Sequence, residues 1–359
     1  MTNLSAGWIA ARFGLTATLY AGLTLQIGAL LALNQLDPGW AVATSVIFVM
    51  AVQGVSGVAK DLAKMGSKSA VKLLAPTEGG GLFRWVALLT GSKNAVKGLG
   101  FLLGAALLAV AGFGAAVLGM AAALTLVLVA VVAFMPAGLP RGRKGAKFSE
   151  VFSKDRNVNW LSAARLFLFG ARDVWFVVGI PIYFYSVLSD GTPEGQRAAF
   201  FLIGSFMALW IIGYGAVQAA APRLLGPERT LPETVRLARV WVGALALIPI
   251  ALALLALIGG AAEPPLWLTL VVVTGLLAFG VVFALNSALH SYLILAFSTA
   301  DRVTMDVGFY YMSNAAGRLL GTALSGFSYQ AGGLPLCLGT AAVMAAASWL
   351  CALRLEKGA

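Results

Sequence analysis

Charged side chains are rare in long apolar stretches, yet residues 159–187 contain two arginines and an aspartate. Arg165 and Arg172 are seven residues apart, so a helix places them on one face, and Asp173 follows directly. A guanidinium is a planar fork that binds phosphate, arsenate or carboxylate through two parallel hydrogen bonds. We interpret both arginines as ligands of an anion and Asp173 as a candidate for proton coupling, with antiport and uniport both open. The residues leave one alternative open, an internal ion pair with a neighbouring helix.

A second polar stripe lies in residues 303–330, where Asp306, Tyr310, Asn314 and Arg318 recur every four residues. On a helix this spacing draws one line of polar side chains along a single face. We predict that Arg318 is a second anion ligand and that Tyr310 and Asn314 line the same cavity. The alternative is a buried polar network between helices. Asp306 lies near the end of the stretch and is a candidate for ion coupling or for a helix cap.

Two lysines lie within a third apolar stretch, residues 83–111. Lys93 and Lys97 share one helical face. Lys97 is too far from the outer end of the stretch for its long side chain to reach the interface comfortably. We predict that both lysines contribute to the anion site.

A run of basic residues begins at the end of the apolar stretch 40–62. Lys60 and its neighbour Asp61 are both candidates for ion coupling. Lys68 and Lys72 continue the same four-residue spacing and are interpreted as contacts with lipid headgroups.

Charges inside apolar stretches point to a membrane setting, and the composition agrees. Of 359 residues, 60% are hydrophobic and 11% are charged, against about 25% charged residues in soluble domains. A soluble globular protein is therefore excluded. Apolar runs of about 20 residues, long enough to cross a bilayer, recur along the chain. We predict an all-α polytopic membrane protein with spans at 15–36, 40–62, 83–111, 115–135, 159–187, 198–221, 240–259, 266–290, 303–330 and 334–353.

The chain offers few residues that could bind a metal or a nucleotide. Its two cysteines, Cys337 and Cys351, are 14 residues apart, and His290 is the one histidine. These spacings match no zinc site, and no Gly-rich loop ending in Lys-Ser/Thr follows a strand. We expect no metal, no cofactor and no ATP-driven mechanism. Paired acids or a nucleophile with a base, which an enzyme would need, are not apparent.

The formal net charge of +11 indicates basic loops facing the cytoplasm rather than a nucleic-acid partner. The connections 136–158 and 222–239 are rich in Lys and Arg. The alternate loops hold mainly acidic residues, namely Asp37, Asp190, Glu194 and Glu263. By the positive-inside rule we place the basic loops and both termini in the cytoplasm, in the inner membrane of a bacterium.

The long connection 136–158 leaves four predicted spans before it and six after it. Ionisable residues occur in the second, third, fifth and ninth spans, whereas the first, fourth, seventh and tenth have none. A period of three spans is expected for transporters built from triple-span repeats, in which every third helix lies in lipid. We predict an incomplete N-terminal bundle over 1–135, a cytoplasmic linker over 136–158 and a six-helix bundle over 159–359. The first two helices of such a fold are expected to be lacking.

Near the N-terminus, Gly7, Arg12 and Gly14 in the segment GWIAARFGL resemble a loop signature of the major facilitator superfamily. The signature lies between the second and third helices of that fold. It carries Asp where this chain has Ala11, and a basic residue where it has Leu15. The resemblance implies a major-facilitator-like helical bundle that begins at the end of the second helix.

Four longer segments resemble the ArsJ-type organoarsenical efflux permeases: GVAKDLAKMGSKSAVKLL (57–74), FRWVALLTGSKNAVKGLGFLLG (83–104), FSEVFSKDRNVNWLSAARLFLFGARDVWFVVGIP (148–181) and ALWIIGYGAVQAAAPRLL (208–225). The resemblance implies export of 1-arseno-3-phosphoglycerate and hence arsenate resistance. It also implies a functional partnership with glyceraldehyde-3-phosphate dehydrogenase, which makes this anion when it uses arsenate in place of phosphate. Two alternatives stay open: an organophosphate or organic-anion exchanger of the same superfamily, and an inactive truncated product.

Overall fold

The computed structural model describes residues 2–75, 80–135, 142, 145, 147–226, 229–260 and 264–356. All regular secondary structure among these residues is helical, which confirms the predicted all-α class. Glu263 and part of the predicted linker, residues 136–141, 143, 144 and 146, lie outside the described residues. The elements are α1 (Thr2–Phe13), α2 (Leu15–Leu33), α3 (Val42–Leu74), α4 (Gly81–Phe134), the short 3-10 helix η1 (Phe148–Val151), α5 (Arg156–Val174), the π-helix η2 (Trp175–Gly179), α6 (Ile180–Leu188), α7 (Pro193–Leu225), α8 (Leu231–Gly259), α9 (Leu266–Phe297) and α10 (Val303–Leu353).

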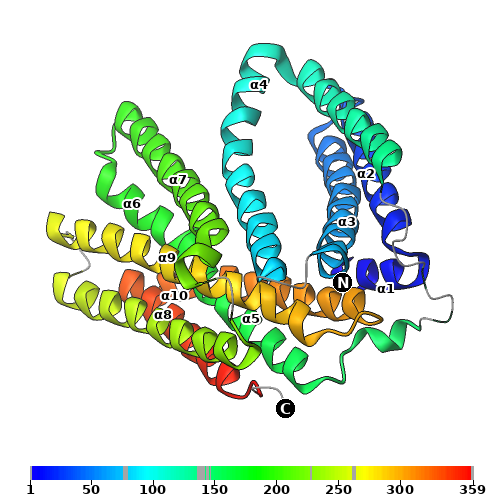
Figure 1. The fold of residues 1–359 in the computed structure, drawn as a ribbon. Helices are drawn as coiled ribbons and strands as arrows, with labels where there is room; N and C mark the ends of the chain where they lie inside the picture. The colour runs from blue at the N-terminus through cyan, green and yellow to red at the C-terminus, as the bar shows by residue number, and fades with distance from the viewer. Residues whose placement is uncertain are drawn as a thin grey trace. The chain divides into compact units, whose positions relative to one another are not determined.

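Two of the helices are far longer than a bilayer is thick, and glycines divide each of them. α4 has 54 residues and α10 has 51. At the usual helical rise these would be about 80 and 76 Å long, whereas the hydrocarbon core is about 30 Å thick. Gly112 interrupts α4 with a φ of 75°, and Gly332 and Gly333 interrupt α10, Gly333 with a φ of 62°. Glycine adopts a positive φ at little cost. Figure 1 shows α4 turning back on itself.

Eight helices among the described residues are long and apolar enough to cross a membrane. This set counts α10 once and includes α4 only from Val110 onward. When both glycine breaks are counted, the helices and half-helices correspond to the ten predicted spans. The chain is a multi-pass membrane protein.

The first of two compact units comprises Met1–Ala75, Gly100–Ser153 and Ser298–Met312. Its core is the long contact between α2 and α3, which lie side by side (Figure 1). The two helices approach closely at Gly22, which has no side chain: a Cβ there would lie only 2.9 Å from the Ala59 carbonyl oxygen. α1 packs on α3, and its Trp8 ring meets the ring of Phe148 edge to face at 6.0 Å.

The second unit comprises Pro76–Leu99, Lys154–Phe297 and Ser313–Ala359. Helix α9 is central, because α5, α7 and α8 all pack against it. Buried aromatic rings fill the interior, with Trp175 meeting Trp210 at 5.3 Å and Phe279 at 5.4 Å. These units differ from the predicted division at 136–158 in two segments. Residues 76–99, predicted in the N-terminal bundle, belong to the second unit, and residues 298–312, predicted in the C-terminal bundle, belong to the first. The predicted repeat organisation itself stays a prediction.

The helix that carries Arg165, Arg172 and Asp173 changes its winding directly after these residues. Asp155 caps its start by accepting a hydrogen bond from the Val158 amide at 2.8 Å. The π-helix η2 follows α5, and Pro181 lies at the start of α6. Proline lacks the N–H that an α-helix needs, and single π-turns inside helices are frequent at functional sites.

Candidate anion-binding site

Two arginine side chains of the second unit meet at one buried carboxylate, and the three charged groups form a triad. Asp173, on α5, is 1% exposed and accepts at Oδ1 from Arg172 Nε at 2.6 Å and Nη2 at 2.5 Å. Arg318, on α10, donates from Nε to Oδ2 at 2.9 Å. The side chain of Arg172 is 12% exposed and that of Arg318 is 47% exposed. The structure thus shows the ion pair that the sequence left open, with two cations on one anion and one net positive charge.

Aromatic rings cover the guanidinium of Arg172. Its Cζ lies 4.9 Å from the ring centre of Phe169, 5.5 Å from that of Phe283 and 5.8 Å from that of Phe176. Rings at these distances attract a cation through their quadrupole, and they keep water away from the ion pair. Arg172 is therefore held on the inner side of the triad, while Arg318 forms its open side.

Glycines set the distance between α5 and α10 at this point. A Cβ on Gly317 would collide with the carbonyl oxygen of Leu166, and one on Gly321 would lie 2.6 Å from that of Gly170. The two backbones therefore touch, as small residues allow in membrane helices. Arg318 follows Gly317, and Asp173 lies three residues after Gly170, so this contact brings the two charges together.

The predicted ligand Arg165 makes a different set of contacts. It is 2% exposed, and its Nη1 donates to Ser287 Oγ on α9 at 2.9 Å. Ser287 Oγ also accepts from Gln218 Nε2 at 3.2 Å and lies 3.2 Å from the hydroxyl of Tyr214, both on α7. Phe169 stacks on the Arg165 guanidinium at 4.0 Å. A single serine hydroxyl thus joins α5, α7 and α9.

Sequence reasoning missed this network, although α9 carries a signal for it. Asn286, Ser287, His290 and Ser291 interrupt an otherwise apolar helix, and all four are fully buried. Among the described residues, no hydrogen-bond partner is found for the amide of Asn286 or for the ring nitrogens of His290. Buried polar groups in a membrane helix are costly and usually face the bundle interior.

The two predicted lysine ligands lie on the part of α4 that belongs to the second unit. Lys93 and Lys97 are both exposed. This part of α4 contacts α7 closely, since a Cβ on Gly98 would lie 2.5 Å from the Ile212 side chain. Asn94 donates to Gln218 Oε1 at 2.7 Å and so joins α4 to the network around Ser287. The predicted contribution of the lysines to anion binding stays a prediction.

In the first unit, the coupling candidate Asp61 has polar partners. It accepts from Thr2 Oγ1 at 2.5 Å and from Lys64 Nζ at 2.8 Å. Lys64 also donates to Asn3 Oδ1 at 2.5 Å. Asp61 thus ties α3 to α1, whereas Lys60 is exposed.

The interpretation of Lys68 as a lipid-headgroup contact is wrong. Lys68 is 2% exposed, and its Nζ donates to the hydroxyl of Tyr311 at 3.1 Å. Its ammonium also lies 5.8 Å from the ring centre of Tyr310, which is itself buried. One turn before Tyr310, the buried Asp306 has Arg302 Nη2 at 3.7 Å from its Oδ1. The four-residue spacing of the lysines indicated that they share one face of α3. It could not show that the first part of α10 packs against that face.

Solved structures of major facilitator superfamily transporters share the architecture of this chain. FucP in the outward conformation matches with a TM-score of 0.71 and 14% identity, over 99% of this chain and 86% of FucP. A bacterial homologue of the iron transporter ferroportin matches with a TM-score of 0.71 and 15% identity, over 99% and 86% of the chains. The human organic anion transporter MFSD10 matches with a TM-score of 0.68 and 17% identity, over 99% and 80%.

The chain has the major facilitator fold. No family model and no curated protein matches its sequence. Identities of this order establish the architecture, and the cargo has to be argued from the residues.

Within this major facilitator fold, the signature residues Gly7, Arg12 and Gly14 have structural explanations. Gly7 lies in α1, where a Cβ would be 2.8 Å from the Thr304 carbonyl oxygen, so α1 touches the start of α10 there. Gly14 separates α1 from α2 with a φ of 91°. The guanidinium of Arg12 stacks on the Trp8 ring at 5.3 Å.

The predicted stripe on α10 divides between the two units of the fold. Asp306 and Tyr310 belong to the first unit, whereas Asn314 and Arg318 belong to the second. Asn314 is buried. The stripe therefore lies along one helix, as predicted, and only its second half lies in the same unit as Asp173.

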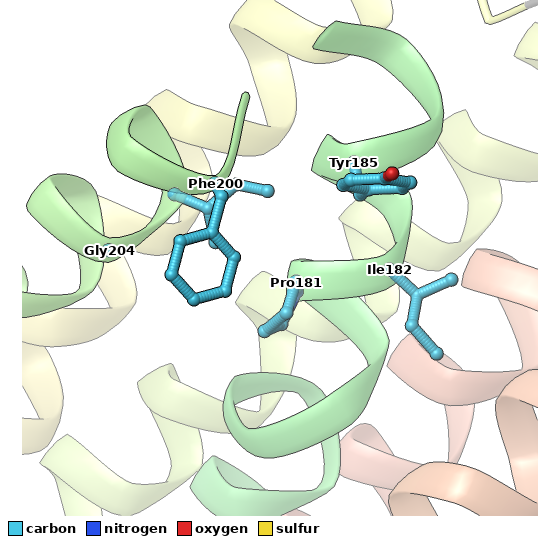
Figure 2. A pocket seen from close by; sticks show the side chains of 6 residues that line it. Pro181, Ile182, Tyr185, Phe200 and Gly204 are labelled. Atoms are coloured by element: carbon cyan, nitrogen blue, oxygen red, sulfur yellow. The ribbon is translucent and has the colours of Figure 1, made fainter. Parts of the chain in front are cut away.

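A cavity between α6 and α7 of the major facilitator fold is unsuited to an anion. It has a volume of about 330 Å³ and is lined by Pro181, Ile182, Tyr185, Phe200, Ile203 and Gly204 (Figure 2). None of these residues carries a charge. In the described part of the chain, no three His, Cys, Asp or Glu side chains group so that they could hold a metal ion.

Proposed function

We propose that this chain is a secondary transporter that exports an anionic organoarsenical, 1-arseno-3-phosphoglycerate, and that Arg172 and Arg318 bind it. The observation that carries the proposal is the meeting of two guanidiniums at one carboxylate inside membrane-spanning helices. Charges in such places are costly and usually serve a substrate or ion pathway. Arg318, whose side chain is nearly half exposed, offers the donors that an anion can reach first.

The charge and chemistry of the site support a multiply charged anion. Two guanidiniums against one carboxylate leave a positive site, and a guanidinium fits phosphate, arsenate and carboxylate groups equally well. Lys93 and Lys97 add two exposed ammonium groups within the same unit. A phosphate at one end and an arsenate at the other would suit separate basic groups.

The identity of the cargo rests on the four segments that resemble ArsJ-type permeases. In that interpretation glyceraldehyde-3-phosphate dehydrogenase makes the cargo in the cytoplasm, and the transporter removes it across the inner membrane. The loop charges support basic loops and both termini in the cytoplasm. Asp173, Asp61 and Asp306, with Lys60, are the candidates for ion coupling.

Everted inner-membrane vesicles provide the direct test. Dehydrogenase, NAD, glyceraldehyde 3-phosphate and arsenate are added outside, and arsenic that accumulates in the vesicles is measured by mass spectrometry. Wild-type vesicles should accumulate arsenic only when the dehydrogenase is present, and Arg318→Ala should abolish this. Arg156→Ala is the matched control, because Arg156 forms an exposed ion pair with Glu356 at 3.0 Å and such pairs contribute little. Accumulation by Arg318→Ala at the wild-type rate would contradict the site.

A second candidate is an exchanger of organophosphates or other organic anions. One observation favours it: the human organic anion transporter MFSD10 has the same fold. Vesicles preloaded with 3-phosphoglycerate distinguish the two candidates. An exchanger would take up labelled 3-phosphoglycerate faster when preloaded, whereas a dedicated arsenical exporter would not.

A further inference from the structure

We propose that the cavity between α6 and α7 binds one acyl chain of a zwitterionic phospholipid, and that Arg197 binds the phosphate of the same lipid. The inference concerns a lipid of the surrounding bilayer. It goes beyond the proposed function, because it does not depend on which solute is transported. The anion site at Arg172 and Arg318 plays no part in it.

The cavity has apolar walls on two membrane-spanning helices. Three residues from each helix line it, namely Pro181, Ile182, Tyr185, Phe200, Ile203 and Gly204 (Figure 2). Both helices belong to candidate membrane spans. The ring of Phe184 on α6 meets that of Phe206 on α7 edge to face at 5.3 Å, so the two walls are joined at this contact. Ordered water needs polar partners, which leaves hydrocarbon as the occupant that a bilayer supplies.

The cavity is open at the surface. The side chain of Phe200 is 77% exposed and that of Ile182 is 44% exposed. Gly204 has no side chain, and a Cβ added there would meet no atom within 4 Å. An acyl chain can therefore enter from the side, as it would from the surrounding bilayer.

A cationic side chain lies on the same face of α7 as the cavity. Arg197 precedes Phe200 by three residues and Gly204 by seven, so a helix places all three on one face. Arg197 is exposed, and no ion pair of its guanidinium is found among the described residues. It is about 10 Å along the helix from Gly204. A phosphate bound by this guanidinium would thus start the acyl chain directly above the cavity.

Arg197 is also an exception to the charge pattern of the chain. One basic residue, Arg197, occurs in the connections that we expect outside the cytoplasm, which are 37–39, 112–114, 188–197, 260–265 and 331–333. The positive-inside rule disfavours Lys and Arg on that side. A lone arginine at the outer end of a span therefore points to a specific anionic group, and every phospholipid offers a phosphate there.

Two carboxylates at the start of α7 favour one kind of headgroup. Glu194 is exposed and lies one turn before Arg197. Asp190 lies over the first turn, because a Cβ on Gly195 would collide with its carboxylate. Side-chain and backbone hydrogen bonds from Thr192 lower the pKa of Asp190, so it is ionised. Two negative charges beside one positive charge repel an anionic headgroup. They suit a zwitterion whose ammonium faces the carboxylates while its phosphate meets the arginine.

Native mass spectrometry of the full chain tests the inference. The chain is reconstituted in nanodiscs with equal amounts of phosphatidylethanolamine and phosphatidylglycerol that have identical acyl chains. We expect the wild type to retain one phosphatidylethanolamine in preference to phosphatidylglycerol. Arg197→Gln should lower this retention about fivefold. Gly204→Leu should lower it about tenfold, because the new side chain takes the place of acyl methylenes. The double variant should lose no more than Gly204→Leu, because one lipid makes both contacts.

Two variants serve as matched controls. Gly213 lies on the same helix, is exposed, and a Cβ there would also meet no atom within 4 Å, but it does not line the cavity. Arg156 forms an exposed ion pair with Glu356. Gly213→Leu and Arg156→Gln should both keep the wild-type retention. If Gly204→Leu does not fold, Phe200→Ser takes its place, since it removes an exposed ring from the wall of the cavity.

The outcomes decide the inference without touching the anion site. Equal retention of the two lipids by the wild type overturns it, and so does retention that Arg197→Gln or the cavity variant leaves unchanged. If Gly204→Leu abolishes self-association and not lipid retention, a second copy of the chain covers the cavity and the inference is wrong. Arsenical uptake by vesicles tests the proposed function separately, so failure of one can be told from failure of the other.

Discussion

Arg318 Nε lies 2.9 Å from Oδ2 of Asp173, although the two residues are 145 positions apart in the chain. The contact is possible because α5 and α10 touch through Gly170, Gly317 and Gly321. Removing one partner of a fully buried ion pair costs about 3–5 kcal/mol. The cost is smaller at Arg318, whose side chain is nearly half exposed, and larger at Asp173, whose loss would leave two guanidiniums without their carboxylate.

Lysine should replace the two arginines unequally. Arg172 makes two hydrogen bonds to Asp173 and stacks among three rings, whereas Arg318 makes one hydrogen bond. A lysine provides a point charge without the planar fork. We expect Arg172→Lys to slow arsenical export about 100-fold and Arg318→Lys about tenfold, with each factor of ten equal to about 1.4 kcal/mol. Export by vesicles with equal protein levels measures this, and equal losses in the two variants would contradict it.

The glycine contact between α5 and α10 should tolerate no side chain. In Gly317→Ala the new methyl group would collide with the Leu166 carbonyl oxygen, so the helices must separate. We expect a destabilisation of about 1–3 kcal/mol, measured as a lower melting temperature in detergent, together with loss of export. Gly326→Ala is the control on the same helix, because a Cβ there has nothing within 4 Å. Similar melting temperatures for the two variants would show that the contact is unimportant.

Loss of the Ser287 hydroxyl should weaken the packing of three helices. Ser287→Ala removes the acceptor of Arg165 and Gln218 and leaves a buried guanidinium less well bonded. We expect a destabilisation of about 1–3 kcal/mol by thermal unfolding. Thr274→Ala on the same helix should change little, because the Thr274 hydroxyl is bonded to its own helix at Leu270. The prediction fails if both variants unfold at the wild-type temperature.

The membrane orientation can be tested with a thiol reagent that does not cross membranes. Asp190→Cys should react in intact cells, because the acidic loops are expected outside. Arg229→Cys, in a basic loop, should react only after the membrane is permeabilised. The parent chain is the control, because it shows how much labelling comes from its own cysteines, Cys337 and Cys351. Labelling of the second variant and not the first in intact cells would reverse the orientation.

Resistance should extend to arsenate and not to arsenite. Arsenite is held by thiolates. Cys337 is buried, with its thiol on the Val174 carbonyl, and Cys351 lies 14 residues further along α10. Cells that express the chain together with the dehydrogenase should therefore tolerate more arsenate, and growth in arsenite should be unchanged. Arsenite resistance that depends on both cysteines would overturn the cargo and the site.

The amino-acid sequence by itself determined the all-helical membrane class and the exceptional residues within its apolar runs, whereas the ten spans stay a prediction beside eight helices that are long and apolar enough to cross a membrane. Apolar runs of bilayer length need no knowledge of contacts to be recognised, since the bilayer alone sets their length. Arg172, Asp173 and Arg318 could be singled out for the same reason, because lipid makes any charge inside a span stand out. Helical spacing also placed Lys68 on one face with Lys64.

Tertiary structure alone decided which of these residues meet. Spacing along one helix says nothing about the helix opposite, so it could not show that Arg318 joins Asp173 while Arg165 joins Ser287. Nor could it show that Lys68 is buried against Tyr311 instead of lying among lipid headgroups. Asp173 and Arg318 meet where Gly170, Gly317 and Gly321 let the backbones of α5 and α10 touch. All three pairings depend on the packing of residues more than a hundred positions apart in the chain.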